Sequence, residues 1–127
     1  MFAVNTPEAM NETFAKAFNS HQLDNLLALY EEDAILIGTE NRVSRGKQQI
    51  AAELSSLLAV PGTFHARNNF CVEHGNIALL RADWVLIDPS GNPAMAGSTA
   101  EIVRRQSSGN WLYVIDHALG AGLARVL

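Results

Sequence analysis

The segment from Leu23 to Gly46 changes its hydrophobic period from that of a helix to that of a strand. Its first part places Leu23, Leu26, Leu27 and Tyr30 on one helical face, which predicts a helix over residues 23–31. A short run of strand formers, residues 34–37, then ends at Gly38, and residues 42–45 form a second short extended piece. A helix that leads directly into a small hairpin requires helices and a sheet to share one core.

The remaining chain places helices first and strands afterwards. Apolar spacing predicts helices over residues 7–19 and 47–58 on either side of that segment. Clusters of turn residues then separate four long predicted strands, over residues 63–73, 77–87, 94–106 and 111–119, and a tail follows from Gly120. This order is typical of an α+β fold with a mainly antiparallel sheet, and we expect residues 1–127 to form a single domain.

The strand over residues 77–87 has two different faces. One face is apolar throughout, from Ala78 to Leu86, and fits a core beneath the helices. The other mixes aliphatic residues with Arg81 and Asp83, as the last strand does with His117. A half-apolar outer face predicts a homodimer formed through the sheet, and a curved sheet partly covered by the tail is the alternative.

Composition excludes several classes of protein. Hydrophobic residues make up 48% of the chain and charged residues 17%, which excludes disorder. The formal charge of −4 argues against nucleic acid as a partner, because phosphate binding needs a basic surface. The first ten residues lack the pattern of a signal peptide, and no apolar run reaches the length of a membrane span. Cys71 is the single cysteine, so no disulfide can form within the chain, which suits a reducing compartment. We therefore expect a cytoplasmic protein without a membrane partner.

Four features occur together in an order that resembles a known superfamily. They are residues 28–34 (ALYEEDA), Gly46 at a helix start, Trp84 within a strand, and residues 103–116 (VRRQSSGNWLYVID). The chain resembles the SnoaL-like and ketosteroid-isomerase-like branch of the nuclear transport factor 2-like superfamily. More closely, it resembles small bacterial members of unknown function, some of which are called calcium/calmodulin-dependent kinase association-domain-like. The resemblance implies helices packed in a curved sheet, a cone-like α+β barrel of the cystatin-like superfold, with a pocket at the open end and frequent dimers.

The same resemblance argues against the best-known activity of the superfamily. Ketosteroid isomerases use a tyrosine and a protonated carboxylic acid as oxyanion donors, together with an aspartate base. Phe14 is the residue similar to the tyrosine, Gly38 the one similar to the base, and Glu101 the one similar to the second acid. Because two of these three roles lack a suitable side chain, that mechanism is not expected here.

Glu101, Asp116 and His117 are the candidate catalytic residues. Glu101 lies in a strand of small and apolar residues, where burial would raise its pKa and make it an acid or base. Pairing with Arg81 or Arg105 on the outer face is the alternative. An aspartate can orient a neighbouring histidine, but successive strand residues face opposite sides, so only one of Asp116 and His117 is expected to line a pocket.

The candidate ligand-binding residues are Tyr30, Trp84, Phe14 and His65. Tyr30 is placed on the second helix, with its hydroxyl either in the pocket or at the rim of the core. Trp84 is the best candidate for an aromatic pocket wall, although core packing is the commoner role. His65 shares a strand face with Arg67, which suits an anionic ligand or an outward position. The sequence contains no metal-binding motif, and no cofactor is expected.

Three hypotheses on function follow. The first is a domain that binds a small organic ligand in an apolar pocket. The second is an isomerase, dehydratase or hydrolase that uses acid–base residues in that pocket. The third is an association module that acts through the outer face of the sheet. The sequence does not identify the ligand.

Overall fold

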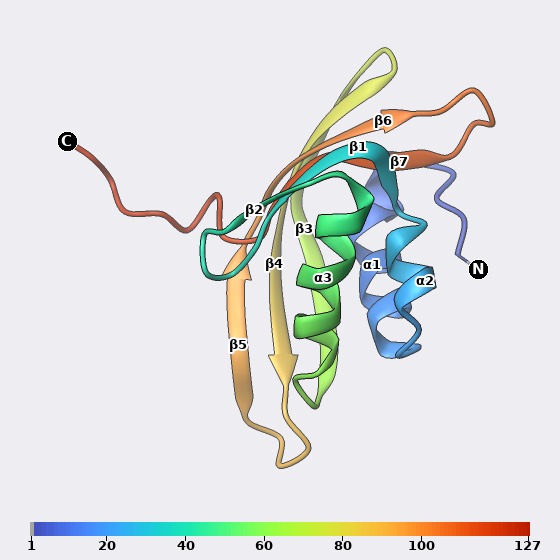
Figure 1. The fold of residues 1–127 in the computed structure, drawn as a ribbon. Helices are drawn as coiled ribbons and strands as arrows, with labels where there is room; N and C mark the ends of the chain where they lie inside the picture. Colours follow the sequence, from blue (N-terminus) through green and yellow to red (C-terminus); the bar gives the residue numbers. More distant parts are fainter. Residues whose placement is uncertain (1) are drawn as a thin grey trace.

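The helices of this chain cover one face of a curved seven-stranded sheet (Figure 1). The structure, a computed structural model, describes residues 2–127. The elements in chain order are η1 (Pro7–Ala9), α1 (Met10–Asn19), α2 (Leu23–Leu27), β1 (Tyr30–Ile37), β2 (Val43–Arg45), α3 (Gly46–Leu58), β3 (Thr63–His74), β4 (Ile77–Ile87), β5 (Pro93–Ser98), β6 (Ala100–Arg105) and β7 (Trp111–His117). The predicted α+β class, with helices in a curved and mainly antiparallel sheet, is confirmed.

The sheet pairs strands that lie far apart in the sequence. Its strand order is β2-β1-β7-β6-β4-β3, and β5 pairs with β4 beside β6. β1 and β7 are parallel, whereas the other pairs are antiparallel. The parallel pair places the hairpin predicted in the opening segment against the last strand.

The prediction that the second helix continues to residue 31 is wrong. α2 ends at Leu27, and Tyr30 is the first residue of β1, where it pairs with Tyr113. The backbone N–H of Tyr113 donates a 2.8 Å hydrogen bond to the carbonyl of Leu29, which joins the chain to the sheet just after the helix. Pairing with a distant strand therefore overrides the local helical period.

The strand predicted over residues 94–106 is interrupted at Thr99, which separates β5 from β6. Both pieces pair with β4, β5 with its second half and β6 with its first half. Thr99 holds the junction, because its N–H donates to the carbonyl of Ala82 and its hydroxyl accepts from the N–H of Ala82, each at 2.9 Å. The strand predicted over residues 111–119 ends at His117.

Two register shifts decide which side chains face the helices. One lies between Asn68 and Phe70 in β3, and the other inserts Val114 between the residues of β7 that pair with Val103 and Ile102. Each shift moves the following side chains to the other face of the sheet. Phe64 and Phe70 would share a face in a regular strand, but here Phe64 is buried and Phe70 is exposed.

The core fills the space between the helices and the inner face of the sheet. Met10 and Phe18 from α1, Ile50 and Leu54 from α3, and Leu80 from β4 are fully or almost fully buried. The predicted apolar face of β4 is confirmed, since Ala78, Leu80, Ala82, Trp84 and Leu86 are all buried. Among residues 2–127, no helix is both long and apolar enough to span a membrane.

Candidate functional site

A cavity of about 260 Å³ lies between α1, α3 and the inner face of the sheet. This volume is slightly below the usual range of about 300–1,000 Å³ for ligand pockets, so it suits a modest organic molecule. The apolar part of its lining comes from helices and strands alike: Phe14, Leu36, Leu54, Leu57, Val60, Phe64, Ala66, Ala82, Trp84, Met95 and Ala118.

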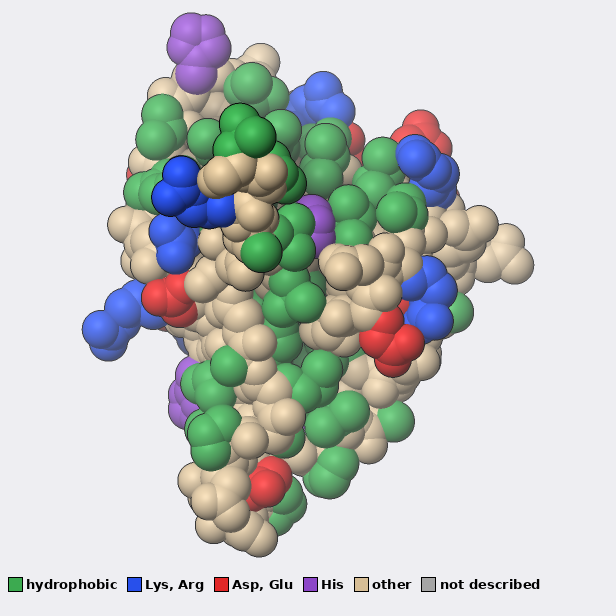
Figure 2. All heavy atoms as spheres, turned by 90° about the vertical axis from the view of Figure 1, so that its left-hand side faces the viewer, with side chains coloured by type: hydrophobic (Ala, Val, Ile, Leu, Met, Phe, Trp, Pro, Cys, Tyr) green, Lys and Arg blue, Asp and Glu red, His purple; other side chains and the backbone are tan. Residues whose placement is uncertain are grey.

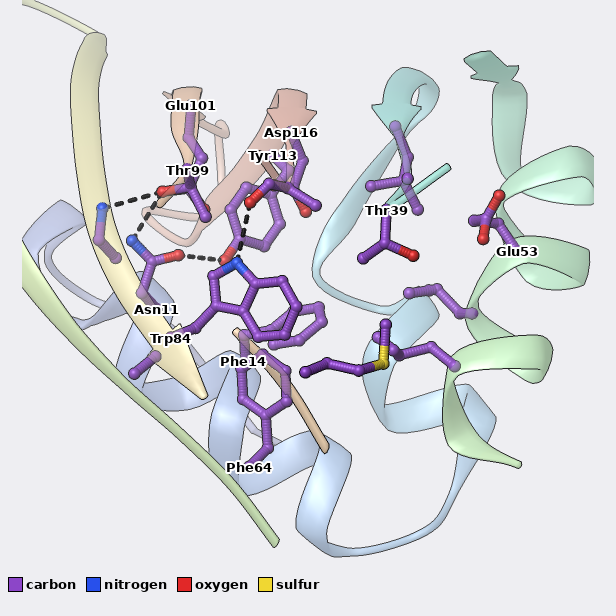
Figure 3. A pocket seen from close by; sticks show the side chains of 18 of the residues that line it. Asn11, Phe14, Thr39, Glu53, Phe64, Trp84, Thr99, Glu101, Tyr113 and Asp116 are labelled. Atoms are coloured by element: carbon purple, nitrogen blue, oxygen red, sulfur yellow. Dashed lines mark hydrogen bonds between the residues drawn. The ribbon is translucent and has the colours of Figure 1, made fainter. Parts of the chain in front are cut away.

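Three aromatic side chains form one wall of the cavity (Figure 3). The Phe64 ring stacks on Trp84 with centroids 5.3 Å apart, and Phe14 lies 5.3 Å from Phe64 at a tilted angle. The indole N–H of Trp84 donates a 2.8 Å hydrogen bond to the carbonyl of Ala118, which fixes the ring. The wall is therefore rigid and presents aromatic surface to the cavity.

Buried polar side chains gather at the inner end of the cavity. Residues 2–127 contain six buried polar or charged residues, and four of them line the cavity: Asn11, Thr99, Glu101 and Asp116. The Asn11 amide donates a 2.6 Å hydrogen bond to Glu101 and accepts one of 2.7 Å from the Tyr113 hydroxyl (Figure 3). It also donates a 2.9 Å hydrogen bond to Asn68. Asn11 thus holds Glu101 in place from α1.

Glu101 and Asp116 face each other across neighbouring strands. They are direct partners in the register of β6 and β7, and only 2% and 6% of their respective surfaces are exposed. Side chains opposite each other in such a pair have Cβ atoms about 4.5–5.5 Å apart. The register therefore forces two carboxyl groups into one buried site.

Burial raises the pKa of both carboxyl groups. Desolvation raises the pKa of Glu101 well above its ordinary value, and the neighbouring Asp116 raises it further. Desolvation also raises the pKa of Asp116, to about 6, although hydrogen bonds from Tyr30 and Glu101 oppose this effect. The two carboxyl groups therefore titrate as a pair, and both bind a proton more readily than an exposed carboxyl group does.

Two tyrosines support this pair from the floor of the cavity. The Tyr30 hydroxyl donates a 2.6 Å hydrogen bond to Asp116, and the Tyr30 and Tyr113 rings lie 4.9 Å apart. Burial is the largest cause that raises the pKa of both hydroxyls, and the two nearby carboxyl groups add to it. Both hydroxyls therefore remain hydrogen-bond donors at neutral pH.

The other end of the cavity opens to solvent between the β1–β2 turn and α3. Glu40, Arg42 and Ser56 line this end and are exposed, while Glu53 is partly buried beside them. Arg42 lies 3.3 Å from Glu53 and 3.8 Å from Glu40. We call this end the mouth.

The candidate residues predicted from the sequence divide into two groups. Glu101, Asp116, Tyr30, Trp84 and Phe14 all line the cavity. The other two candidates, His117 and His65, are not among its lining residues. His117 follows Asp116 on the opposite face of β7, as alternation requires, and His65 is exposed beside a shallow surface hollow.

Sequence reasoning missed Asn11, Thr99, Tyr113 and Glu53. Two of them carry a usable signal, because each is a polar residue on an apolar helical face. Asn11 lies three residues before Phe14, and Glu53 lies three residues after Ile50. Tyr113 had no such signal, since the bulge at Val114 breaks the alternation that would relate it to Asp116.

Within residues 2–127, no cluster of three or more His, Cys, Asp or Glu side chains is arranged to hold a metal ion. The polar groups at the inner end of the cavity include two carboxyl groups, two tyrosine hydroxyls and the Asn11 amide. Together they can accept, donate and transfer protons next to an apolar ligand.

Solved structures with this fold come from several bacteria. A candidate calcium/calmodulin-dependent protein kinase type II association domain from Thiobacillus denitrificans superposes with a TM-score of 0.79 at 21% identity, covering 94% of this chain and 98% of that one. An NTF2-like protein with a cystatin-like fold from Novosphingobium aromaticivorans gives 0.76 at 20% identity, over 92% and 81% of the two chains. A ketosteroid isomerase-like protein from Erwinia carotovora gives 0.69 at 20% identity, over 87% and 89%. At these identities the likeness concerns the fold alone.

Sequence comparison identifies the family. A comparison with curated proteins gives no match. Residues 11–114 match the SnoaL-like domain family, and this range contains Tyr30, Trp84, Glu101 and Tyr113, while Asp116 follows it by two residues. The match covers most of the chain, which therefore belongs to the SnoaL-like domain family.

Proposed function

We propose that this protein binds a small, largely apolar organic molecule in the cavity, with a polar group of that molecule against the Glu101–Asp116 pair. The observation that carries the proposal is a buried carboxyl pair at the closed end of an aromatic cavity. Burying a charged group without full compensation is unfavourable, so such pairs concentrate at functional sites. An apolar cavity with a few convergent polar groups is also the usual form of a ligand site.

Calorimetry with a simple arylalkyl alcohol, 4-phenylbutanol, tests this proposal. Its ring matches the aromatic wall and its hydroxyl can reach a carboxyl group. Ala82→Leu places extra bulk inside the cavity, because Ala82 is a buried lining residue. Ala52→Leu makes the same change on the exposed side of α3.

We expect the parent protein and Ala52→Leu to bind the alcohol with similar affinity, and Ala82→Leu to bind it at least tenfold more weakly. Circular dichroism establishes that both variants are folded. Equal binding by Ala82→Leu, or no binding by any of the three proteins, contradicts the proposal.

The second candidate function is proton-transfer catalysis at the same site. The observation that favours it is the pairing of Asp116, whose pKa is about 6, with Glu101, whose pKa burial raises well above its ordinary value, and with a hydroxyl donor from Tyr30. A base with a pKa near the working pH and adjacent donors can remove a proton beside a carbonyl group and stabilise the resulting enolate. In this role Asp116 is the base and Glu101 the acid.

Deuterium exchange into 4-phenyl-2-butanone, followed by NMR, measures this activity directly. Exchange at the carbons beside the carbonyl should exceed the rate in buffer alone, and Asp116→Asn should abolish the excess. Exchange that is unaffected by Asp116→Asn would exclude this mechanism.

The outer face of the sheet supports association of two copies. Phe70 and Val72 in β3 and Ile77 and Leu79 in β4 are between 42% and 58% exposed. Figure 2 shows apolar side chains running down this face, with charged groups mainly at its margins. Neighbours named as association domains share the fold, and we propose a homodimer through this surface.

Sedimentation analysis of Leu79→Glu tests the homodimer. The same substitution at Val43, which is 45% exposed on β2 at the other end of the strand order, is the control. We expect a monomer for Leu79→Glu and a dimer for the control. A parent protein with the mass of a monomer contradicts the proposal.

A further inference from the structure

Glu53 is a carboxylate held at the mouth of the cavity. It lies on α3, where it shares a face with the buried residues Ile50 and Leu54, and its side chain is 12% exposed. One of its oxygens, Oε1, is buried and forms an ion pair with the Arg42 guanidinium at 3.3 Å, without the geometry of a hydrogen bond. This carboxylate therefore retains capacity to accept a hydrogen bond.

Gly38 creates the space that Glu53 occupies. A Cβ atom at position 38 would lie 2.7 Å from the Glu53 carboxyl carbon and 2.9 Å from each of its oxygens. These distances are shorter than any normal contact, so a side chain at position 38 and the present position of the carboxylate exclude each other. The glycine that follows β1 thus leaves room for an acid from α3 in the cavity lining.

Glu53 and the Glu101–Asp116 pair lie at different ends of the cavity. Figure 3 shows Glu53 on the opposite side of the pocket from Glu101, with Trp84 and Phe14 in the space between. A ligand with its apolar body on the aromatic wall and one end at Glu101 would extend its other end toward Glu53. The cavity therefore offers two separate polar positions.

The charges at the mouth favour a cation over an anion. Glu40 and Glu53 both lie near the single guanidinium of Arg42. The Arg42 side chain is 60% exposed and pairs with both acids, of which Glu40 is 77% exposed and Glu53 only 12%. Two carboxylates therefore share one guanidinium at the mouth, and the net negative charge disfavours an anionic group there.

We propose that Glu53 is a ligand-binding residue and that the ligand carries a protonated amine at the end that faces the mouth. This inference rests on the proposed function, since it requires that the cavity binds a ligand. It adds the chemical class of that ligand: an elongated molecule with an apolar body and a cationic end. Arg42 and the space at Gly38 serve to position the carboxylate.

Calorimetry with three matched compounds tests the inference. 4-Phenylbutylamine, 4-phenylbutanol and 4-phenylbutyrate share a ring and a four-carbon chain, and they end in a cation, a neutral donor and an anion. We expect the amine to bind at least tenfold more tightly than the carboxylate. Glu53→Gln should reduce that ratio at least tenfold, because it removes the charge and frees Arg42 to attract the anion.

Two further substitutions separate a local role of Glu53 from a general effect of charge. Glu32→Gln makes the same change at an exposed acid of β1 outside the cavity lining, and it should leave the ratio unchanged. Gly38→Ala should reduce the ratio as Glu53→Gln does, because it displaces the carboxylate. Gly122→Ala, where an added Cβ would meet only an ordinary 3.6 Å contact, is its control.

The outcomes distinguish this inference from the proposed function. Binding of all three compounds with equal affinity, or a preference for the amine that survives Glu53→Gln but is lost in Asp116→Asn, overturns the inference and leaves the cavity as a ligand site. Binding of none of the compounds overturns the proposed function and this inference together.

Discussion

Replacing Asp116 with asparagine should stabilise the protein at neutral pH and leave its stability at acid pH almost unchanged. The pKa of Asp116 is about 6 in the folded protein, against an ordinary value of 3.8. An acid whose pKa is higher in the folded state binds its proton more tightly there. Its protonated form is therefore favoured by folding, and stability is lost as the pH rises from about 4 to about 6.

The size of this loss follows from the difference between the two pKa values. One unit corresponds to 1.36 kcal/mol, so a difference of roughly two units amounts to about 3 kcal/mol above pH 6. Asparagine cannot ionise, so Asp116→Asn should be more stable than the parent protein by about this amount at pH 7.5. At pH 4 the advantage should be less than about 1 kcal/mol, because the parent's Asp116 is then protonated in the folded state.

Urea unfolding at pH 4 and at pH 7.5, followed by circular dichroism, measures both differences. Asp33→Asn, at an exposed acid of β1, is the control and should follow the parent protein at both pH values. Parallel stability curves for the parent and Asp116→Asn across this range would refute the reasoning. So would a loss of stability in the variant at pH 7.5.

Three further changes test other parts of the site and the fold. Tyr30→Phe removes the hydroxyl that donates to Asp116, so the pKa of Asp116 should rise further. An NMR titration of the Asp116 carboxyl carbon measures this pKa, and an unchanged value contradicts the role of Tyr30. Asn11→Leu removes the amide donor to Glu101 and the acceptor for Tyr113, so urea unfolding should show a free energy of unfolding lower by about 1–3 kcal/mol. Asn25→Leu is the control, at a partly exposed asparagine. Leu54→Ala deletes a side chain that is 1% exposed and should cost about 2–5 kcal/mol, whereas Leu123→Ala in the exposed tail should cost less than about 0.5 kcal/mol.

The sequence predicts the elements of this fold better than their ends. Periodicity places α1 and β4 well, because each has one strongly apolar face along its whole length. It fails after Leu27, where Tyr30 has the correct spacing for the helix but pairs with Tyr113 in the sheet. The competing interaction lies more than 80 residues away in the chain, so no local pattern can reveal it.

The candidate site was predicted in part, and the bulges explain the remainder. Alternation correctly indicates that Asp116 and His117 cannot both face the cavity, because the two are neighbours in a regular stretch of β7. It does not place Tyr113 beside Asp116, since Val114 adds one residue between them. The pairing of Glu101 with Asp116 depends on the register of β6 and β7, which only the folded sheet defines.

The arrangement of this cavity carries a cost that the fold alone does not require. Leucine or valine at positions 101 and 116 could pack on the buried inner face of the sheet, as Leu80 and Val103 do nearby. The chain instead places two acids there, surrounds them with an amide and two hydroxyls, and leaves an empty volume beside them. The predicted gain of about 3 kcal/mol in the free energy of unfolding for Asp116→Asn is the stability that the protein loses by having an ionisable residue at position 116. A cost of that size, next to a cavity of ligand dimensions, is the pattern expected where stability has been exchanged for binding or catalysis. If Asp116→Asn is more stable but no longer binds the probe compounds, the charge at Asp116 serves the ligand and not the fold.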